Sequence, residues 1–184
     1  MKLNAPALCA CLSLLLSPVR AVGVDPADDF ARLPLSQAIR TQVGAGTRAV
    51  VVFEDAYCPY CRALHQTLRQ SDDVVVFTFL LDVLDPDSRA KADRIWCSPD
   101  RARALARWFG AHEVPATVAG CSAPVASLRA LADRLHVQAT PTLLFADGSM
   151  HAGAISAAAL EQRLRAAQVE HRPQSIAPVG ANDR

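Results

Sequence analysis

The chain has 184 residues, a formal charge of +1 and an ordinary globular composition, with 51% hydrophobic and 20% charged residues. Length and composition are typical of a single domain and exclude a disordered or fibrous protein. The nearly balanced charge gives no sign of a nucleic-acid or membrane-surface binding protein.

Residues 1–21 have the features of a secretory signal peptide. A basic Lys2 precedes an apolar stretch, Ala5–Leu16, and the residues before Ala21 suit cleavage after it. The alternative of a membrane anchor is disfavoured, because a spanning helix takes about 20 apolar residues. Lipid attachment at Cys11 is a weaker alternative, since the apolar run continues beyond that residue. We therefore predict an exported protein that is free of the membrane after cleavage and carries a formal charge of about −1.

The first elements of the mature chain frame a pair of cysteines. Residues 22–47 predict a short helical lead-in, with Leu35, Ile39 and Val43 at helical spacing. The β-branched run 47–54 predicts a strand buried on both faces. Helical spacing begins directly after it at Pro59, a residue suited to the first position of a helix.

The remaining elements alternate between a sheet and a block of helices. Residues 73–81 predict a second buried strand, and residues 87–97, 98–110 and 123–137 predict three helices. Residues 140–153 predict two strands joined at Asp147-Gly148, a strong hairpin signal. A helix capped by Ser156 follows, and residues 169–184 predict a disordered tail.

Signal removal leaves four cysteines: Cys58, Cys61, Cys97 and Cys121. An even number in an exported chain predicts disulfide chemistry. Cys58 lies at a predicted helix N-terminus, where unpaired backbone N–H groups and the helix dipole favour a thiolate. Cys61 lies one turn further along and is more shielded. We therefore predict that Cys58 attacks disulfides and that Cys61 resolves the mixed disulfide.

A metal site is the main alternative use of these residues. Four cysteines and His65 could hold zinc, but Cys97 and Cys121 lack the second close pair of a structural zinc site. We expect His65 to pack or to form a hydrogen bond on the helix surface, and we expect no metal and no cofactor. Glu54 and Asp55 could tune proton transfer at the cysteine pair, but acidic residues at a strand end are more often solvated, so neither is assigned a role.

Four stretches together resemble the catalytic domain of the bacterial DsbC/DsbG thiol-disulfide interchange proteins. They are "VVFEDAYCPYC", "RIWC", "VAGCSAP" and "VQATPTLLFADGSMHAG", within residues 48–168. The resemblance implies an α/β protein with a thioredoxin-like fold and a helical insertion. It also implies a periplasmic location and exchange of disulfides with cysteines of exported proteins.

The resemblance also implies roles for individual residues. Thr140 and Pro141 would form a cis peptide bond beside the redox pair and bind substrate, although proline is also tolerated at a strand start for structural reasons. Pro59 and Tyr60 would form the active-site loop. Cys97 and Cys121, neither of which lies in a close pair, would form a structural disulfide.

The partners expected from the resemblance are cysteine-containing exported proteins and an unidentified redox partner, DsbD-like if the pair is kept reduced. Family members carry a dimerisation domain before the catalytic domain. Only about 26 residues separate Ala21 from Arg48, fewer than a domain needs, so we expect a monomer with weak isomerase activity. A dedicated oxidant or reductant, and a redox-inert binding module or holdase, stay open as alternatives.

Overall fold

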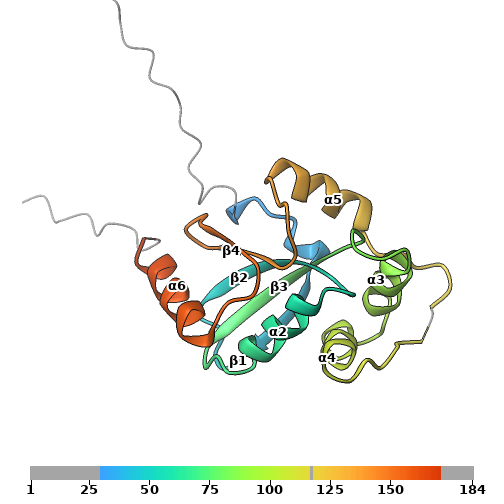
Figure 1. Cartoon of the computed structure of the whole chain (residues 1–184), viewed down its shortest axis with the longest axis horizontal. Coiled ribbons are helices and arrows are strands. Elements are labelled where there is room, and N and C mark those ends of the chain that lie inside the picture. The colour runs from blue at the N-terminus through green and yellow to red at the C-terminus, as the bar shows by residue number, and fades with distance from the viewer. Residues whose placement is uncertain (1–29, 117, 171–184) are drawn as a thin grey trace, which may run out of the picture.

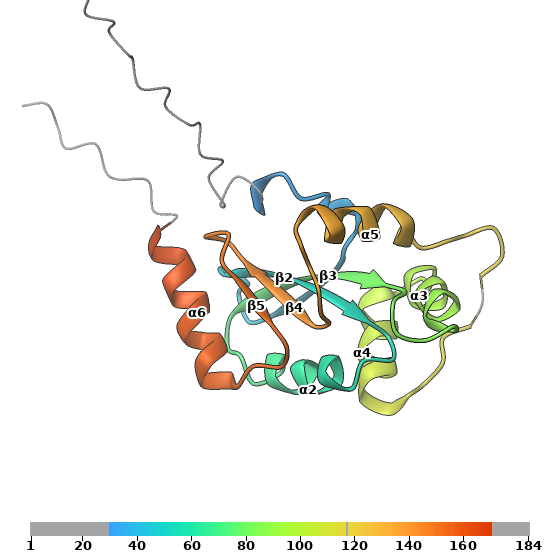
Figure 2. The ribbon, with the colours of Figure 1, turned by 45° about the horizontal axis from the view of Figure 1, so that its top comes forward.

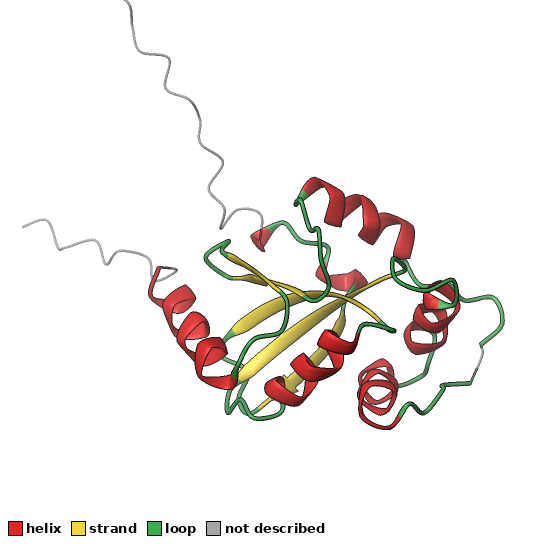
Figure 3. Cartoon of the chain, in the orientation of Figure 1, coloured by secondary structure: helices red, strands yellow, loops and turns green. Residues whose placement is uncertain are grey.

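Two continuous apolar runs form the middle of the central sheet. In the computed structural model, which describes residues 30–116 and 118–170, they are β2 (Ala49–Asp55) and β3 (Val74–Leu81), paired in parallel. Strands covered on both faces need apolar side chains on both, which explains why neither run alternates with polar residues. Both predicted strands are confirmed (Figure 3).

Three antiparallel strands complete the sheet in the order β1-β3-β2-β4-β5. The strand β1 (Ile39–Val43) pairs with β3, while β4 (Thr142–Phe145) pairs with β2 and with β5 (Met150–Ala152). The predicted hairpin is confirmed, and Gly148 supplies a positive φ of 80° in its turn.

The prediction of a helical lead-in is wrong for most of the residues that the structure describes. Phe30 and Ala31 are helical and Leu35–Gln37 form a short 3-10 turn, η1, but the predicted helical residues Ile39 and Val43 lie in the strand β1. A spacing of four residues keeps side chains on one face of a helix and also on one face of a strand, so the pattern could not separate the two. The strand ends at Gly44, where φ is 64° and a Cβ atom would lie 1.9 Å from the carbonyl oxygen of Asp72.

The sheet is surrounded by the helices α2 (Pro59–Leu68), α3 (Ser88–Trp96), α4 (Arg101–Ala111), α5 (Val125–Arg134) and α6 (Ala157–Glu170). Figure 2 shows α2 and α5 on opposite sides of the sheet. Leu64 of α2 and Leu160 of α6 pack with Val50 and Val52 of β2. Leu128 of α5 packs with the alternate β2 residues, Val51 and Phe53.

The helices α3 and α4 come between β3 and α5 in the chain. In space they pack side by side beyond one end of the sheet (Figure 1). They enclose a third apolar core that contains Cys58 and Cys61 together with Ile95 and Leu105. A disulfide joins Cys97, at the end of α3, to Cys121, with an S–S distance of 2.02 Å. The inserted helices therefore pack directly against the candidate redox pair.

Two expected segments fall largely outside the described residues. The expected signal peptide, residues 1–21, lies outside them entirely. Of the expected disordered tail, residues 171–184 also lie outside, whereas α6 continues through Glu170, so the tail was predicted to begin two residues too early. The final helix begins where expected, and the Ser156 hydroxyl accepts from the Ala159 N–H at 3.3 Å.

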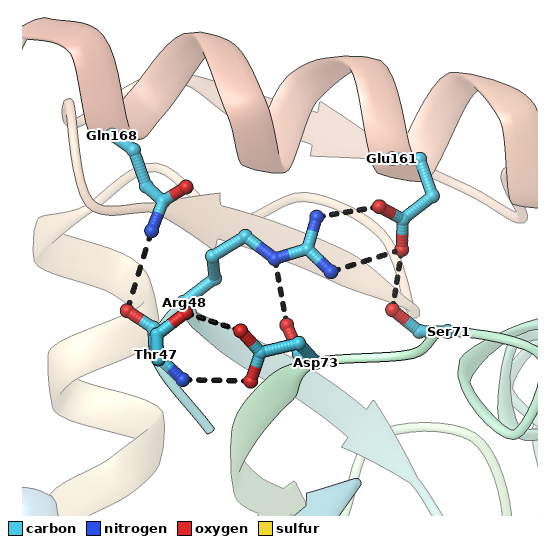
Figure 4. Close-up of polar contacts among 6 residues, drawn as sticks. All are labelled: Thr47, Arg48, Ser71, Asp73, Glu161 and Gln168. Carbon is cyan, nitrogen blue, oxygen red and sulfur yellow. Dashed lines mark hydrogen bonds and ion pairs between the residues drawn. The ribbon is translucent and has the colours of Figure 1, made fainter. Parts of the chain in front are cut away.

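Arg48 links α6 to the residues at the start of β2 and β3 through hydrogen bonds and an ion pair (Figure 4). Arg48 is 9% exposed, and its guanidinium donates to the Glu161 carboxylate at 2.5 Å and to the Asp73 carbonyl at 2.6 Å. The Ser71 hydroxyl donates to the same carboxylate. The hydrogen bonds from Arg48 and then Ser71 hold the pKa of Glu161 below its ordinary value of 4.5. This network joins residues more than 100 positions apart in the chain.

We expect Arg48→Met to lower the free energy of unfolding by about 2–3 kcal/mol at pH 7, because it leaves a partly buried carboxylate without its cation. Urea unfolding would measure the change. Arg89→Met is the matched control, since Arg89 is 44% exposed and its pair with Asp93 lies within one helix; its loss should cost about 0.5 kcal/mol or less.

The pH dependence follows from the lowered pKa of Glu161. The stabilisation is fully present above pH 4.5, the ordinary value, and is lost as pH falls through the lower folded value. Wild type and Arg48→Met should therefore converge in stability in acid. An Arg48→Met protein as stable as Arg89→Met at pH 7 would contradict this account.

Candidate active site

The turn between β2 and α2 places Cys58 at the N-terminus of a helix. Cys58 is the N-cap residue, with an extended backbone, and Pro59 begins the helix. The Cys58 Sγ accepts the Cys61 backbone N–H at 3.2 Å. An N-cap sulfur aimed at an otherwise unpaired N–H is stabilised when it carries negative charge. The geometry thus favours a thiolate at this position.

A second loop, 82 residues further along the chain, closes over the same sulfur. The Thr140-Pro141 peptide bond is cis, and the Cys58 Sγ donates to the Thr140 carbonyl oxygen at 3.2 Å. Tyr60, in the loop between the two cysteines, is 64% exposed. The Cys58 sulfur thus lies against the backbone of the cis-proline loop, and the exposed Tyr60 lies two residues along the chain from it.

Cys61 lies in a different environment from Cys58. Its residue is 0% exposed, and burial together with the nearby Glu54 carboxylate raises the pKa of the Cys61 thiol far above its ordinary value. Glu54 is also fully buried, and both its oxygens lie 3.0 Å from Nε2 of His65. His65 is 13% exposed and stacks on Phe109. The buried thiol therefore lies near the hydrogen-bonded pair of Glu54 and His65, whose histidine is partly exposed.

The Asp55 carboxylate organises the turn in front of Cys58. It is 0% exposed and accepts backbone N–H groups of Tyr57, Val83 and Leu84 at 2.8, 2.8 and 3.1 Å. The hydroxyl of Ser88, the first residue of α3, donates to it at 2.9 Å. Four donors satisfy one buried carboxylate, which is the condition for burying such a charge.

The expectation that Glu54 and Asp55 are solvated is wrong, whereas His65 packs on Phe109 and hydrogen-bonds to Glu54 at a partly exposed position of its helix. The sequence signal that could have corrected it is a buried apolar strand that continues into two acids immediately before the cysteine motif. The structure places Cys58, Pro59, Tyr60 and Cys61 at the start of α2, and it places the cis Thr140-Pro141 bond beside the Cys58 sulfur. Cys97 and Cys121 are bonded to each other, so they do not join the first pair in a four-cysteine zinc site.

Comparison with known proteins agrees with this geometry. Residues 35–168 match the family described as a thioredoxin-like domain. The chain belongs to this family. The predicted α/β, thioredoxin-like fold is confirmed, and the domain match begins before β1, which the sequence had placed outside the catalytic domain.

Individual relatives are disulfide interchange proteins. The chain is 42% identical over 135 residues to a probable thiol:disulfide interchange protein DsbC of Bordetella avium, covering 73% of this chain and 48% of that protein. It is 27% identical over 108 residues to DsbC of Escherichia coli K12, covering 56% and 45%. A solved disulfide interchange protein from Neisseria gonorrhoeae superposes with a TM-score of 0.70 at 34% identity, covering 74% of this chain and 99% of that one.

The sequence similarity covers only part of the curated relatives. The chain spans about half the length of the curated relatives that it matches.

Within residues 30–116 and 118–170, no helix has the length and apolar character needed to cross a membrane.

The raised pKa of Cys61 leads to a prediction for Glu54. In a Cys58→Ser background, Glu54→Gln should lower the pKa of Cys61 by about one unit, because it removes a buried negative charge that opposes the thiolate. The pH dependence of iodoacetamide labelling at Cys61 measures the shift. Glu161→Gln, which changes a glutamate on α6 instead, is the control and should leave the labelling curve in place. An unchanged curve for Glu54→Gln would show that the carboxylate does not act on this thiol.

Proposed function

We propose that the chain is a periplasmic thiol-disulfide oxidoreductase that exchanges disulfides with cysteines of exported proteins through Cys58 and Cys61. The observation that carries the proposal is the contact between the N-cap sulfur of Cys58 and the Thr140 carbonyl of the cis-proline loop. It places the N-cap sulfur, which also accepts the Cys61 backbone N–H, beside backbone groups that can pair with an extended client. The similarity to proteins named thiol:disulfide interchange proteins supports the same chemistry.

The chemistry follows from the two environments. The Cys58 thiolate attacks a client disulfide, forms a mixed disulfide and releases one client thiolate. Cys61 then loses its proton and attacks the Cys58 sulfur, which releases the second client thiol and leaves the Cys58–Cys61 disulfide. The client gains two electrons and the enzyme loses two, and the reverse sequence oxidises a client. A redox partner, DsbD-like if the working form is reduced, would restore the starting state.

We further propose that the chain is exported by a cleaved signal at residues 1–21 and acts mainly as a monomer. The described residues contain one redox pair, so a client held there is held by one contact. A second tethered contact would benefit from a high effective concentration. With a single contact, Cys61 resolves the mixed disulfide before a client thiol can, so net reduction or oxidation exceeds isomerisation.

We expect the exported protein to cycle between dithiol and disulfide in glutathione buffers and to reduce a simple protein disulfide. Cys58→Ser should lower that rate by at least about a hundredfold, because the attacking sulfur is lost. Light scattering should give the mass of one chain, and recovery of a scrambled multi-disulfide substrate should be slow.

The outcomes separate the alternatives. A pair found mostly oxidised in its native compartment favours an oxidant, and a reduced pair favours a reductase or isomerase. A stable dimer with efficient unscrambling would contradict the monomer proposal and support a DsbC-like isomerase. A Cys58–Cys61 pair that never cycles would contradict the enzyme proposal and leave a binding module.

A further inference from the structure

The inserted helix α3 carries a buried lysine beside the active-site turn. The side chain of Lys91 is 7% exposed. Its ammonium lies 4.2 Å from the centroid of the Trp108 ring and 5.8 Å from that of Tyr57. Lysine is almost never buried unless it is paired, and aromatic faces attract a cation at these distances. Lys91 therefore occupies a site built for a positive charge.

Both rings hold the backbone immediately before Cys58. The Trp108 indole N–H donates to the Ala56 carbonyl at 2.6 Å. Tyr57 packs edge-on against Trp108, with ring centroids 5.5 Å apart. Ala56 and Tyr57 are the two residues that precede the reactive cysteine, so the ammonium contacts the side chains that fix this turn.

The counterion of Lys91 lies on its solvent side. The Asp87 carboxylate is 3.7 Å from the ammonium, but the Asp87 side chain is 52% exposed. The Tyr57 hydroxyl donates to the same carboxylate, which raises the pKa of Tyr57 to about 12 and keeps the phenol a neutral donor at neutral pH. Water screens an exposed charge more strongly than a buried one. The negative charge of Asp87 is therefore screened more strongly than the buried ammonium of Lys91.

We propose that Lys91 is a positioning residue for disulfide exchange, which holds Tyr57 and Trp108 against the active-site turn and favours the Cys58 thiolate through its positive charge. The inference rests on the proposed function. Ala92, next to Lys91, packs in the same core as Cys58 and Cys61. The charge thus lies at the interface between the inserted helices and the redox pair.

Other charged groups also face the redox pair and must be held constant in a test. Glu54 and His65 lie on the Cys61 side. Arg62 of α2 contacts His112, the residue that ends α4 and whose ring meets Trp108. The effect of Lys91 therefore has to be read as the difference between variants that keep all of these groups, over the whole pH range.

The test is the rate of Cys58 alkylation by iodoacetamide as a function of pH in the reduced full chain, with the label located by peptide mass mapping. Lys91→Met keeps most of the side-chain volume and removes the charge. Its curve should move to higher pH by about 0.5 to 1 unit. The rate at pH 5 should fall by about twofold to fourfold, because the smaller thiolate fraction is partly offset by a more nucleophilic sulfur.

Three further variants separate charge from packing. Lys91→Arg keeps the charge and should restore most of the wild-type curve. Arg89→Met removes a positive charge from the exposed side of the same helix and should leave the curve unchanged. Asp87→Asn removes the screened counterion and should move the curve to lower pH. Asp87 is exposed, so this variant also serves if Lys91→Met does not fold.

Identical curves for Lys91→Met and Arg89→Met would overturn the proposal, and so would an equal shift in Lys91→Arg and Lys91→Met. In the Asp87→Asn protein, an unchanged or upward-shifted curve would do the same. Alkylation requires no client and no redox partner. A wild-type chain whose Cys58 is unreactive at low pH would therefore contradict the proposed function itself, whereas a reactive wild type with no Lys91 effect contradicts only this inference.

Discussion

The carboxylate of Asp55 accepts hydrogen bonds from three parts of the chain, and the geometry of the site depends on these bonds. Its donors are the active-site turn, the loop after β3 and the first residue of α3. A fully buried carboxylate is tolerated only when its lone pairs are satisfied, so these segments must be in place together. The carboxylate thereby couples the inserted helices to the position of Cys58, although α3 begins 30 residues after Cys58 in the chain.

The two sulfurs differ because the same turn presents them to different surroundings. Cys58, which is 3% exposed, caps a helix and contacts the Thr140 carbonyl of the cis-proline loop. Cys61 lies one helical turn deeper, where burial and the Glu54 carboxylate oppose its ionisation. One sulfur is therefore ready to attack, while the other is held as a thiol until a mixed disulfide forms next to it. This asymmetry gives the order of steps in the proposed exchange.

The parts of the fold that local sequence determines were predictable. The buried strands β2 and β3, the helix that starts at Pro59 and the hairpin at Asp147-Gly148 each follow from residues within a few positions of one another. The strand β1 was not predictable, because apolar residues four apart suit a helix and a strand equally, and its pairing partner β3 lies about 35 residues away. The pairing with β3 therefore decides that residues 39–43 form a strand and not a helix.

The candidate site divides in the same way. Cys58 and Cys61 were evident from their spacing, whereas the approach of Thr140 could be expected only from resemblance to a family. The burial of Glu54 and Asp55 escaped prediction because their partners come from other elements, His65 on α2 and Ser88 on α3. Lys91 and Trp108 carry no motif at all, and their relation to the turn exists only after α3 and α4 pack together.

The central claim, that Cys58 is the attacking sulfur and Cys61 the resolving one, is tested most directly by trapping the mixed disulfide. Reduced Cys61→Ser protein would be incubated with an unfolded, disulfide-containing client, quenched in acid and analysed by non-reducing electrophoresis and peptide mapping. The account predicts a covalent adduct through Cys58 that a reductant cleaves, and little adduct with Cys58→Ser. Adducts formed mainly through Cys61 in the Cys58→Ser protein, or none with either variant, would contradict it.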